Sequence, residues 1–215
     1  MRVGALPRNS IAPHFYGFTW STIGVATEYV KPAEVVRDNE LISVPSLSER
    51  RSLMVDGEWL EEDITSGGAA DLPNAYKDKI CNIDYKTLRY PGHWGWVDSI
   101  LDKCPDGEGR STFLEKLMLK EVPSLEDDVV IVYAAVQGLD SDGILRRVEA
   151  SYRIEPIQIG EVTLRAIQST TAAGMAEVAR ILLEGNHQGV LLQSQLDPAN
   201  FMSGPFVSAI YGERR

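Results

Sequence analysis

The chain has 215 residues, 44% hydrophobic and 24% charged, so it can bury the core of one large globular domain without disulfides. Its formal net charge of −10 argues against a nucleic-acid surface, which needs a basic patch. No apolar run reaches the roughly 18 residues of a membrane-spanning helix, and no secretory signal follows Met1. We therefore expect a cytoplasmic protein that binds neither nucleic acid nor membrane.

Cysteine and histidine are sparse. Cys81 and Cys104 lie far apart and form no CxxC pair, and the three histidines are scattered, at His14, His93 and His187. Metal sites need clustered ligands. We expect reduced thiols and no metal.

The first part of the chain predicts short elements separated by turns. A strand near the N-terminus and a loop precede a helix that begins at Ser21 or Thr22, both good N-cap residues, and ends at Lys31-Pro32. Two hairpins are predicted around Asp38-Asn39 and Asp56-Gly57. A polar, glycine-containing loop then leads into a short helix.

The middle of the chain predicts a helix–strand–helix order. The short helix covers residues 72–77, and a strand then ends at Pro91-Gly92. The following helix, over residues 94–104, has Trp96, Ile100 and Leu101 on one face.

A strand pair follows in the second half. The β-branched run 129–138 predicts a buried strand, with an antiparallel partner over residues 146–156 that alternates apolar and polar side chains. The acidic triplet at residues 126–128 is interpreted as a solvated entrance to the first strand. One more strand is predicted over residues 163–168.

The clearest helix is predicted from Thr170, with Ser169 or Thr170 as its cap. Its apolar stripe is Met175, Val178 and Leu182, widened by Ala179 and Ile181, and it ends at Gly185 in a left-handed conformation. A strand fragment is expected after Gly189.

These elements predict an α+β fold, with a mixed, largely antiparallel sheet and helices on one face. The other face is expected to lie open or be covered by a partner. No GxGxxG motif is present, and Ser66-Gly67-Gly68 is the nearest glycine pair. We therefore expect no Rossmann domain in this chain and no cofactor bound by it alone.

Three segments in this order resemble the carboxyl-terminal domain of the saccharopine dehydrogenase-like family. They are VGALPRN followed by FTWSTIGVATEY, then TSGGAADLP, then YKTLRYPGHWGWV. The closing STTAAGMAEVARILLEG and the tail after it are also similar to the family's ending. The family includes saccharopine reductases, lysine 6-dehydrogenases and carboxynorspermidine dehydrogenases.

The resemblance implies a carboxyl-terminal domain like that of glyceraldehyde-3-phosphate dehydrogenase. Residues 1–168 would bind substrate and form a homodimer through the sheet. Residues 169–215, the closing helix and tail, would pack toward an amino-terminal Rossmann domain on the same or a separate chain. That domain would hold NAD or NADP, and because this chain begins near the family's linker, we expect it to be inactive alone.

The implied reaction is oxidation or reduction at the CH–NH bond of a lysine- or saccharopine-like amino acid. Two alternatives stay open. The chain could be a free-standing, non-catalytic oligomerisation or binding module of the same fold, or part of a related reductase for carbonyls or polyamine precursors.

Arg89 and His93 are the first candidates for the site. Arg89 ends a predicted strand, and its planar guanidinium could bind a substrate carboxylate through two hydrogen bonds. His93 could accept the proton that leaves the substrate amine as the imine forms. The alternatives are a structural arginine of the turn and a hydrogen-bonded turn histidine.

Two further groups complete the candidate site. Thr65, Ser66 and Gly67 could present hydroxyl and backbone N–H groups to the substrate, and Gly68 to the cofactor; the alternative is a tight loop. In the family, the substrate cleft is lined at the positions that the resemblance assigns to Tyr16, Trp20 and Ser21; the alternative is core packing.

Overall fold

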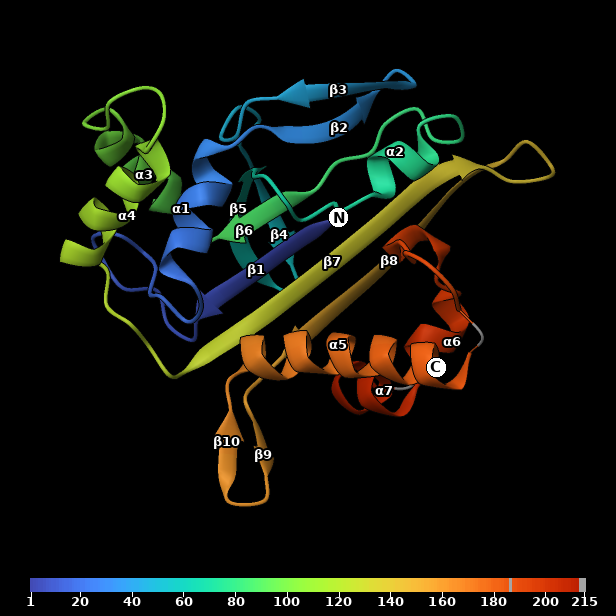
Figure 1. Cartoon of the computed structure of the whole chain (residues 1–215). Helices are drawn as coiled ribbons and strands as arrows, with labels where there is room; N and C mark the ends of the chain where they lie inside the picture. Colours follow the sequence, from blue (N-terminus) through green and yellow to red (C-terminus); the bar gives the residue numbers. More distant parts are fainter. Residues whose placement is uncertain (186, 213–215) are drawn as a thin grey trace.

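A six-stranded sheet in the order β4-β5-β6-β1-β7-β8 forms the centre of the computed structural model, which describes residues 1–185 and 187–212 (Figure 1). β1 and β6 are parallel, and every other neighbouring pair is antiparallel. The predicted α+β class and the mixed, largely antiparallel sheet are therefore confirmed. The sheet strands are β1 (Arg2–Pro7), β4 (Arg51–Val55), β5 (Glu58–Ile64), β6 (Lys86–Arg89), β7 (Asp128–Leu139) and β8 (Leu145–Ile154).

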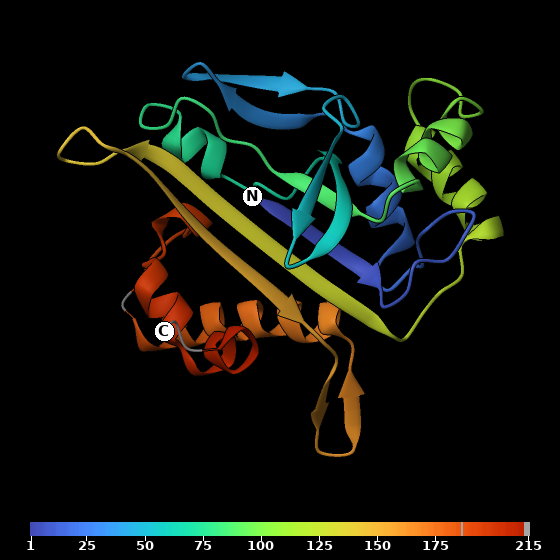
Figure 2. The same cartoon turned by 180° about the vertical axis from the view of Figure 1, so that it is seen from behind.

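Helices cover one face of this sheet. Ala5, Val130 and Ile154 pack against Ala166 of α5 (Ala166–Glu184) and against α7 (Pro205–Tyr211). The other face, with Leu6 and Leu88 at its centre, packs against side chains of the β4–β5 hairpin, which curls over it (Figure 2). We expected this second face to lie open or to need a partner, but the end of the sheet itself covers part of it.

A second core lies between the helices α1 (Thr22–Val30), α3 (His93–Leu101) and α4 (Arg110–Glu121). The buried face of α3 consists of His93, Trp94, Val97 and Ile100, whereas Trp96 and Leu101 are only partly buried. Ile100 is buried as predicted, whereas Trp96 and Leu101 lie beside the buried face rather than on it. The buried face includes Trp94, whose ring packs edge-on against Tyr29 of α1 with the ring centres 5.2 Å apart.

The turns and the start of α1 that were predicted from local sequence are confirmed. Ser21 caps α1 by accepting a hydrogen bond from the backbone N–H of Gly24 at 3.2 Å. Asp38 and Asn39 both have positive φ, which joins β2 (Ala33–Arg37) to β3 (Glu40–Val44) in the tight turn that suits twisted strands. Asp56 and Gly57 do the same between β4 and β5. The short helix α2 (Leu72–Tyr76) also forms where it was predicted.

The β7–β8 pair is antiparallel as predicted, but only the first part of β7 is buried. Val129, Val130 and Ile131 lie in the core, whereas Val136 is 64% exposed and its cross-strand partner Val148 is 71% exposed. Both views show this hairpin extending past the other strands of the sheet (Figures 1 and 2). The prediction of a buried strand was therefore wrong for its distal half, which lies largely in solvent.

Helix α5 begins earlier than predicted, at Ala166, and the strand expected over residues 163–168 is limited to β10 (Val162–Leu164), which pairs with β9 (Ile157–Ile159). The start of α5 is capped by the Asp128 carboxylate, which accepts hydrogen bonds from the backbone N–H groups of Ala166 at 2.6 Å and Ile167 at 2.9 Å. Asp128 is fully buried, so the acidic triplet is not simply a solvated strand entrance. The proposed division at residue 168 falls within α5 and stays a prediction.

The packing of α5 also differs from the predicted stripe. Met175 and Leu182 are exposed. Ile181, which was predicted to widen the stripe, is buried, together with Ala173 and Glu177. Glu177 is buried because its carboxylate accepts hydrogen bonds from Phe206 at 3.0 Å and Val207 at 3.5 Å, at the start of α7. Gly185 is extended rather than left-handed.

The tail is helical instead of containing the expected strand fragment. A 3-10 turn (Gln193–Gln195), α6 (Pro198–Ser203) and α7 follow α5. Pro198 and Pro205 occupy the first helical positions, where the missing N–H needs no partner. None of the helices in residues 1–185 and 187–212 is both long enough and apolar enough to cross a membrane.

Candidate functional site

A cleft of about 780 Å³ lies over β1 and β6, between α1 and α5. Its floor is the helix-covered face of the sheet, and the two helices form its walls. Residues from the predicted site and residues absent from the prediction share this cleft. They are Val3, Ala5, Thr19, Trp20, Ser21, Glu28, Tyr85, Thr87, Arg89, Arg165, Ile167, Gln168, Thr171, Ala172 and Met175.

Arg89 occupies the floor of the cleft at the end of β6 and is 1% exposed. Its guanidinium carbon lies 4.7 Å from the ring centre of Tyr16 and 5.7 Å from those of Tyr29 and Trp94. Nε donates a hydrogen bond to the Tyr29 hydroxyl at 2.8 Å, and Nη1 donates one to the Leu88 carbonyl at 2.8 Å. The aromatic rings and these two bonds hold the guanidinium in one orientation.

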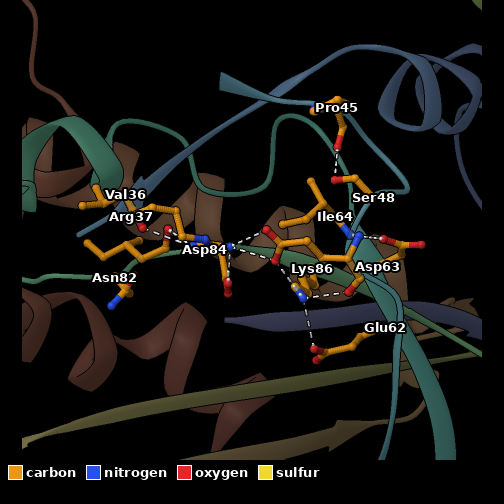
Figure 3. A network of polar contacts seen from close by, with 12 residues as sticks. Val36, Arg37, Pro45, Ser48, Glu62, Asp63, Ile64, Asn82, Asp84 and Lys86 are labelled. Atoms are coloured by element: carbon orange, nitrogen blue, oxygen red, sulfur yellow. Dashed lines mark hydrogen bonds and ion pairs between the residues drawn. The ribbon is translucent and has the colours of Figure 1, made fainter. Parts of the chain in front are cut away.

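The charge of Arg89 has no carboxylate partner within 4.0 Å among the described residues, and its Nη2 has no hydrogen-bond partner there. Lys86, at the other end of β6, differs in this respect. It is equally buried, and its ammonium lies 3.2 Å from a Glu49 oxygen and 3.4 Å from a Glu62 oxygen (Figure 3). Buried cations are normally paired in this way, so Arg89 is the exception that points to a ligand.

His93 lies behind Arg89 and does not line the cleft. Its Nδ1 donates to the His14 carbonyl at 2.7 Å, which leaves Nε2 to accept from the Tyr29 hydroxyl at 3.0 Å. Burial, together with the charge of Arg89, holds the pKa of His93 well below its usual value, so the ring is neutral. Its predicted role as proton acceptor stays a prediction, and its observed contacts orient Tyr29 and hence Arg89.

The structure separates the three residues predicted from the first part of the chain. Trp20 and Ser21 line the cleft, whereas Tyr16 is fully buried beneath the Arg89 guanidinium. Trp20 also packs against Gly24 of α1, where a Cβ would lie 2.6 Å from the indole ring. Trp20 therefore combines packing with exposure to the cleft.

The loop from Thr65 to Gly68 lies outside the main cleft. Thr65 and Gly67 line a neighbouring cavity of about 270 Å³, and Tyr85 lines both cavities. The Thr65 hydroxyl is hydrogen-bonded to that of Thr87 at 2.6 Å, and the Ser66 N–H donates to the Glu28 carbonyl at 3.1 Å. The loop thus supports the cleft from outside, and its predicted contact with substrate stays a prediction.

The sequence profile of the saccharopine dehydrogenase C-terminal domain matches residues 1–209. The chain belongs to this family. Members of the saccharopine dehydrogenase family are NAD(P)-dependent dehydrogenases. The sequence-based recognition of the family is therefore confirmed.

A solved structure supports the same fold. The apo form of saccharopine dehydrogenase (L-Glu forming) from Saccharomyces cerevisiae is similar, with a TM-score of 0.57 and 13% sequence identity. The match covers 87% of this chain and 59% of the yeast chain. This saccharopine dehydrogenase C-terminal domain thus corresponds to little more than half the length of that protein.

The glycine pair of this family member does not lie in a Rossmann-type unit. The only loop with adjacent glycines, at Gly67 and Gly68, follows β5, which is antiparallel to both of its neighbours. A Rossmann-type dinucleotide site needs a parallel strand–turn–helix–strand unit. Gly68 instead allows Tyr85 to pack closely, because a Cβ there would lie 2.2 Å from the tyrosine ring. The predicted contact of Gly68 with a cofactor stays a prediction.

Sequence reasoning missed Glu28 and Arg165, which line the cleft on opposite sides of Arg89's strand. Arg165 immediately precedes α5, and its Nη1 reaches the Leu125 carbonyl at 3.4 Å. Glu28 lies in the last turn of α1, and burial raises its pKa to about 7, against the opposing effect of Arg89. No sequence signal distinguishes Glu28 from an ordinary surface glutamate, since only the fold places it beside Arg89.

Within the described ranges, no cluster of His, Cys, Asp and Glu could hold a metal ion.

Proposed function

We propose that this chain is the substrate-binding and dimerisation part of an NAD(P)-dependent oxidoreductase that acts on the CH–NH bond of a lysine- or saccharopine-like amino acid. The observation that carries the proposal is the buried Arg89 guanidinium, which faces the cleft without a carboxylate partner. The family of the chain agrees with it.

A substrate carboxylate is the ligand that this environment favours. Arginine binds carboxylates through two parallel N–H···O bonds, and at Arg89 Nη2 is free for such contacts among the described residues. The aromatic rings beneath the guanidinium keep it in place before the ligand arrives. Apolar side chains on the walls, including Trp20, Ile167 and Met175, suit the aliphatic part of a lysine-like molecule.

Substitution at Arg89 tests this assignment. Arg89→Met removes the charge while keeping a long side chain, and we expect the affinity for L-lysine and for saccharopine to fall roughly tenfold or more, because a charge-assisted hydrogen bond contributes about 1.5–3 kcal/mol. Arg89→Lys should weaken binding less, since it retains the charge but not the planar guanidinium. Isothermal titration calorimetry measures both.

Arg51→Met is the matched control, because Arg51 is exposed on β4, away from the cleft residues. Unchanged affinity in the Arg89 variants would remove Arg89 from the site. A wild-type chain that forms a dimer and binds neither amino acid would favour the alternative of a non-catalytic oligomerisation module.

Dimerisation is proposed through the distal half of the β7–β8 hairpin. Val136 and Val148 face each other across the two strands, and Leu139 and Leu145 at the tip are also largely exposed. β8 is in addition an edge strand, whose outer backbone groups can pair with another strand. An apolar surface of this kind is typical of a face covered by a second subunit.

We expect a dimer of the wild-type chain and a monomer of the Val136→Lys/Val148→Lys variant in sedimentation-equilibrium experiments. The matched control is Ile159→Lys/Val162→Lys in the β9–β10 hairpin, where the side chains are comparably exposed. A dimer that survives the first pair of substitutions would refute the role of this surface in dimerisation.

The exposed Met175 and Leu183 of α5 are the candidates for contact with a nucleotide-binding domain.

A further inference from the structure

Glu28 places a carboxyl group on the wall of the cleft that contains Arg89. It lies in the last turn of α1, and its side chain is half-buried. In residues 1–185 and 187–212, its carboxylate has no hydrogen-bond donor within 3.5 Å and no cationic side-chain nitrogen within 4.0 Å. The cleft therefore presents a cationic group and an anionic group that do not neutralise each other by direct contact.

The position of Glu28 is unfavourable for a carboxylate. The last turn of a helix carries the negative end of the helix dipole, which repels a negative charge. Burial adds a desolvation penalty that no hydrogen bond offsets. Groups kept in such positions occur most often at functional sites.

The backbone around Glu28 is fixed. Its carbonyl accepts hydrogen bonds from the Ser66 N–H at 3.1 Å and the Ser46 hydroxyl at 2.9 Å. The same Ser46 hydroxyl also donates to the Lys31 carbonyl at 2.5 Å. These bonds anchor the end of α1, so the carboxyl group stays on the wall of the cleft.

We propose that Glu28 binds the ammonium group of the substrate while Arg89 binds its carboxylate, so that the cleft selects free amino acids over simple carboxylic acids. This assignment rests on the proposed function of the cleft and adds a residue that determines its specificity. Ammonium and carboxylate form a charge-assisted pair, which is strongest where water is excluded.

Binding of an ammonium group has a consequence for protons. The pKa of Glu28 is raised to about 7, so in the empty cleft near neutral pH the carboxyl is about half protonated. A bound ammonium favours the carboxylate and displaces that proton. The charged or titratable groups around Glu28 are Arg89 on β6, Arg165 before α5, and the hydroxyls of Tyr16, Tyr29 and Tyr85.

The test compares L-norleucine with hexanoate, which have the same carbon skeleton with and without the amino group. Titration calorimetry in buffers of different ionisation enthalpy measures affinity and proton release together. We expect the wild-type chain to bind L-norleucine more tightly than hexanoate and to release about half a proton near neutral pH. Glu28→Gln should weaken L-norleucine binding roughly tenfold, abolish the proton release and leave hexanoate binding unchanged.

Two further variants make the outcome specific. Glu28→Asp keeps the charge and should retain part of the preference for L-norleucine. Glu34→Gln, at an exposed position of β2, should change nothing. If Glu28→Gln affects both ligands equally or neither, the role of Glu28 is refuted while carboxylate binding at Arg89 stands. If the wild-type chain binds neither ligand at millimolar concentration, the proposed function fails together with this inference.

Discussion

Asp128 and Asp127 are adjacent in sequence, but the structure assigns them very different effects on stability. The Asp128 carboxylate is fully buried and accepts the N–H groups of Ala166 and Ile167 at the start of α5. Asp127 forms an exposed ion pair with Arg8 at 2.9 Å. Substitution of each residue by alanine therefore compares a buried helix cap with a surface salt bridge.

Asp128→Ala leaves two backbone N–H groups without partners, one of them buried, and each unpaired group costs about 1–3 kcal/mol. The substitution also removes the cost of burying a charge, so we expect the free energy of unfolding to fall by about 2–4 kcal/mol. This is a large share of the total free energy of unfolding of a typical domain, about 5–15 kcal/mol. Asp128→Asn keeps one acceptor oxygen and should lose about half as much. Asp127→Ala should change stability by less than about 1 kcal/mol.

Urea denaturation followed by circular dichroism measures these differences. For Asp128→Ala we expect the midpoint to fall by roughly 1–2 M, with a nearly unchanged slope. Equal shifts for Asp127→Ala and Asp128→Ala would refute the view that a residue of β7 holds the start of α5 in place.

Two further predictions concern packing and titration near the cleft. Gly68→Ala should destabilise the fold by about 1–3 kcal/mol, because its Cβ would collide with the Tyr85 ring. Gly95→Ala in α3 should be neutral or stabilising, because an added Cβ there meets no atom within 4 Å. Thermal unfolding compares the two variants, and similar melting temperatures would contradict this. Glu28 has its pKa raised from 4.5 to about 7, so the folded state binds its proton more tightly than the unfolded chain does. The resulting stabilisation is full below the unfolded pKa and is lost as the pH rises through about 7. The free energy of unfolding of the wild type should therefore fall relative to Glu28→Gln between about pH 5 and about pH 8, and a difference independent of pH would show that Glu28 keeps an ordinary pKa.

The features predicted correctly from sequence depend on neighbouring residues. The turns at Asp38-Asn39 and Asp56-Gly57 need only backbone conformations that these residue types favour, and Ser21 caps a helix three residues away. The motif TLRYPGH likewise placed Arg89 at the end of a strand. The fold class followed from the order of the predicted elements, in which helices and antiparallel strands are segregated.

The features that were missed depend on contacts between distant segments. The start of α5 is set by Asp128, 38 positions earlier in the chain, and no local pattern shows that bond. Glu177 is buried because it caps α7, although glutamate in a helix is normally exposed. Glu28 joins the site only because the end of α1 lies over β6, so its sequence context offered no sign of it.

The two helices that form the walls of the cleft, α1 and α5, are both hydrogen-bonded to the central sheet or to a loop that follows one of its strands. α5 is attached to β7 through Asp128, and the end of α1 is attached through Ser66 to the loop that follows β5. β5 and β7 belong to one hydrogen-bonded sheet, which resists stretching across its strands. The distance between the walls is therefore fixed in the folded chain. If the cleft binds an amino acid as proposed, its width limits the length and thickness of the side chain that fits.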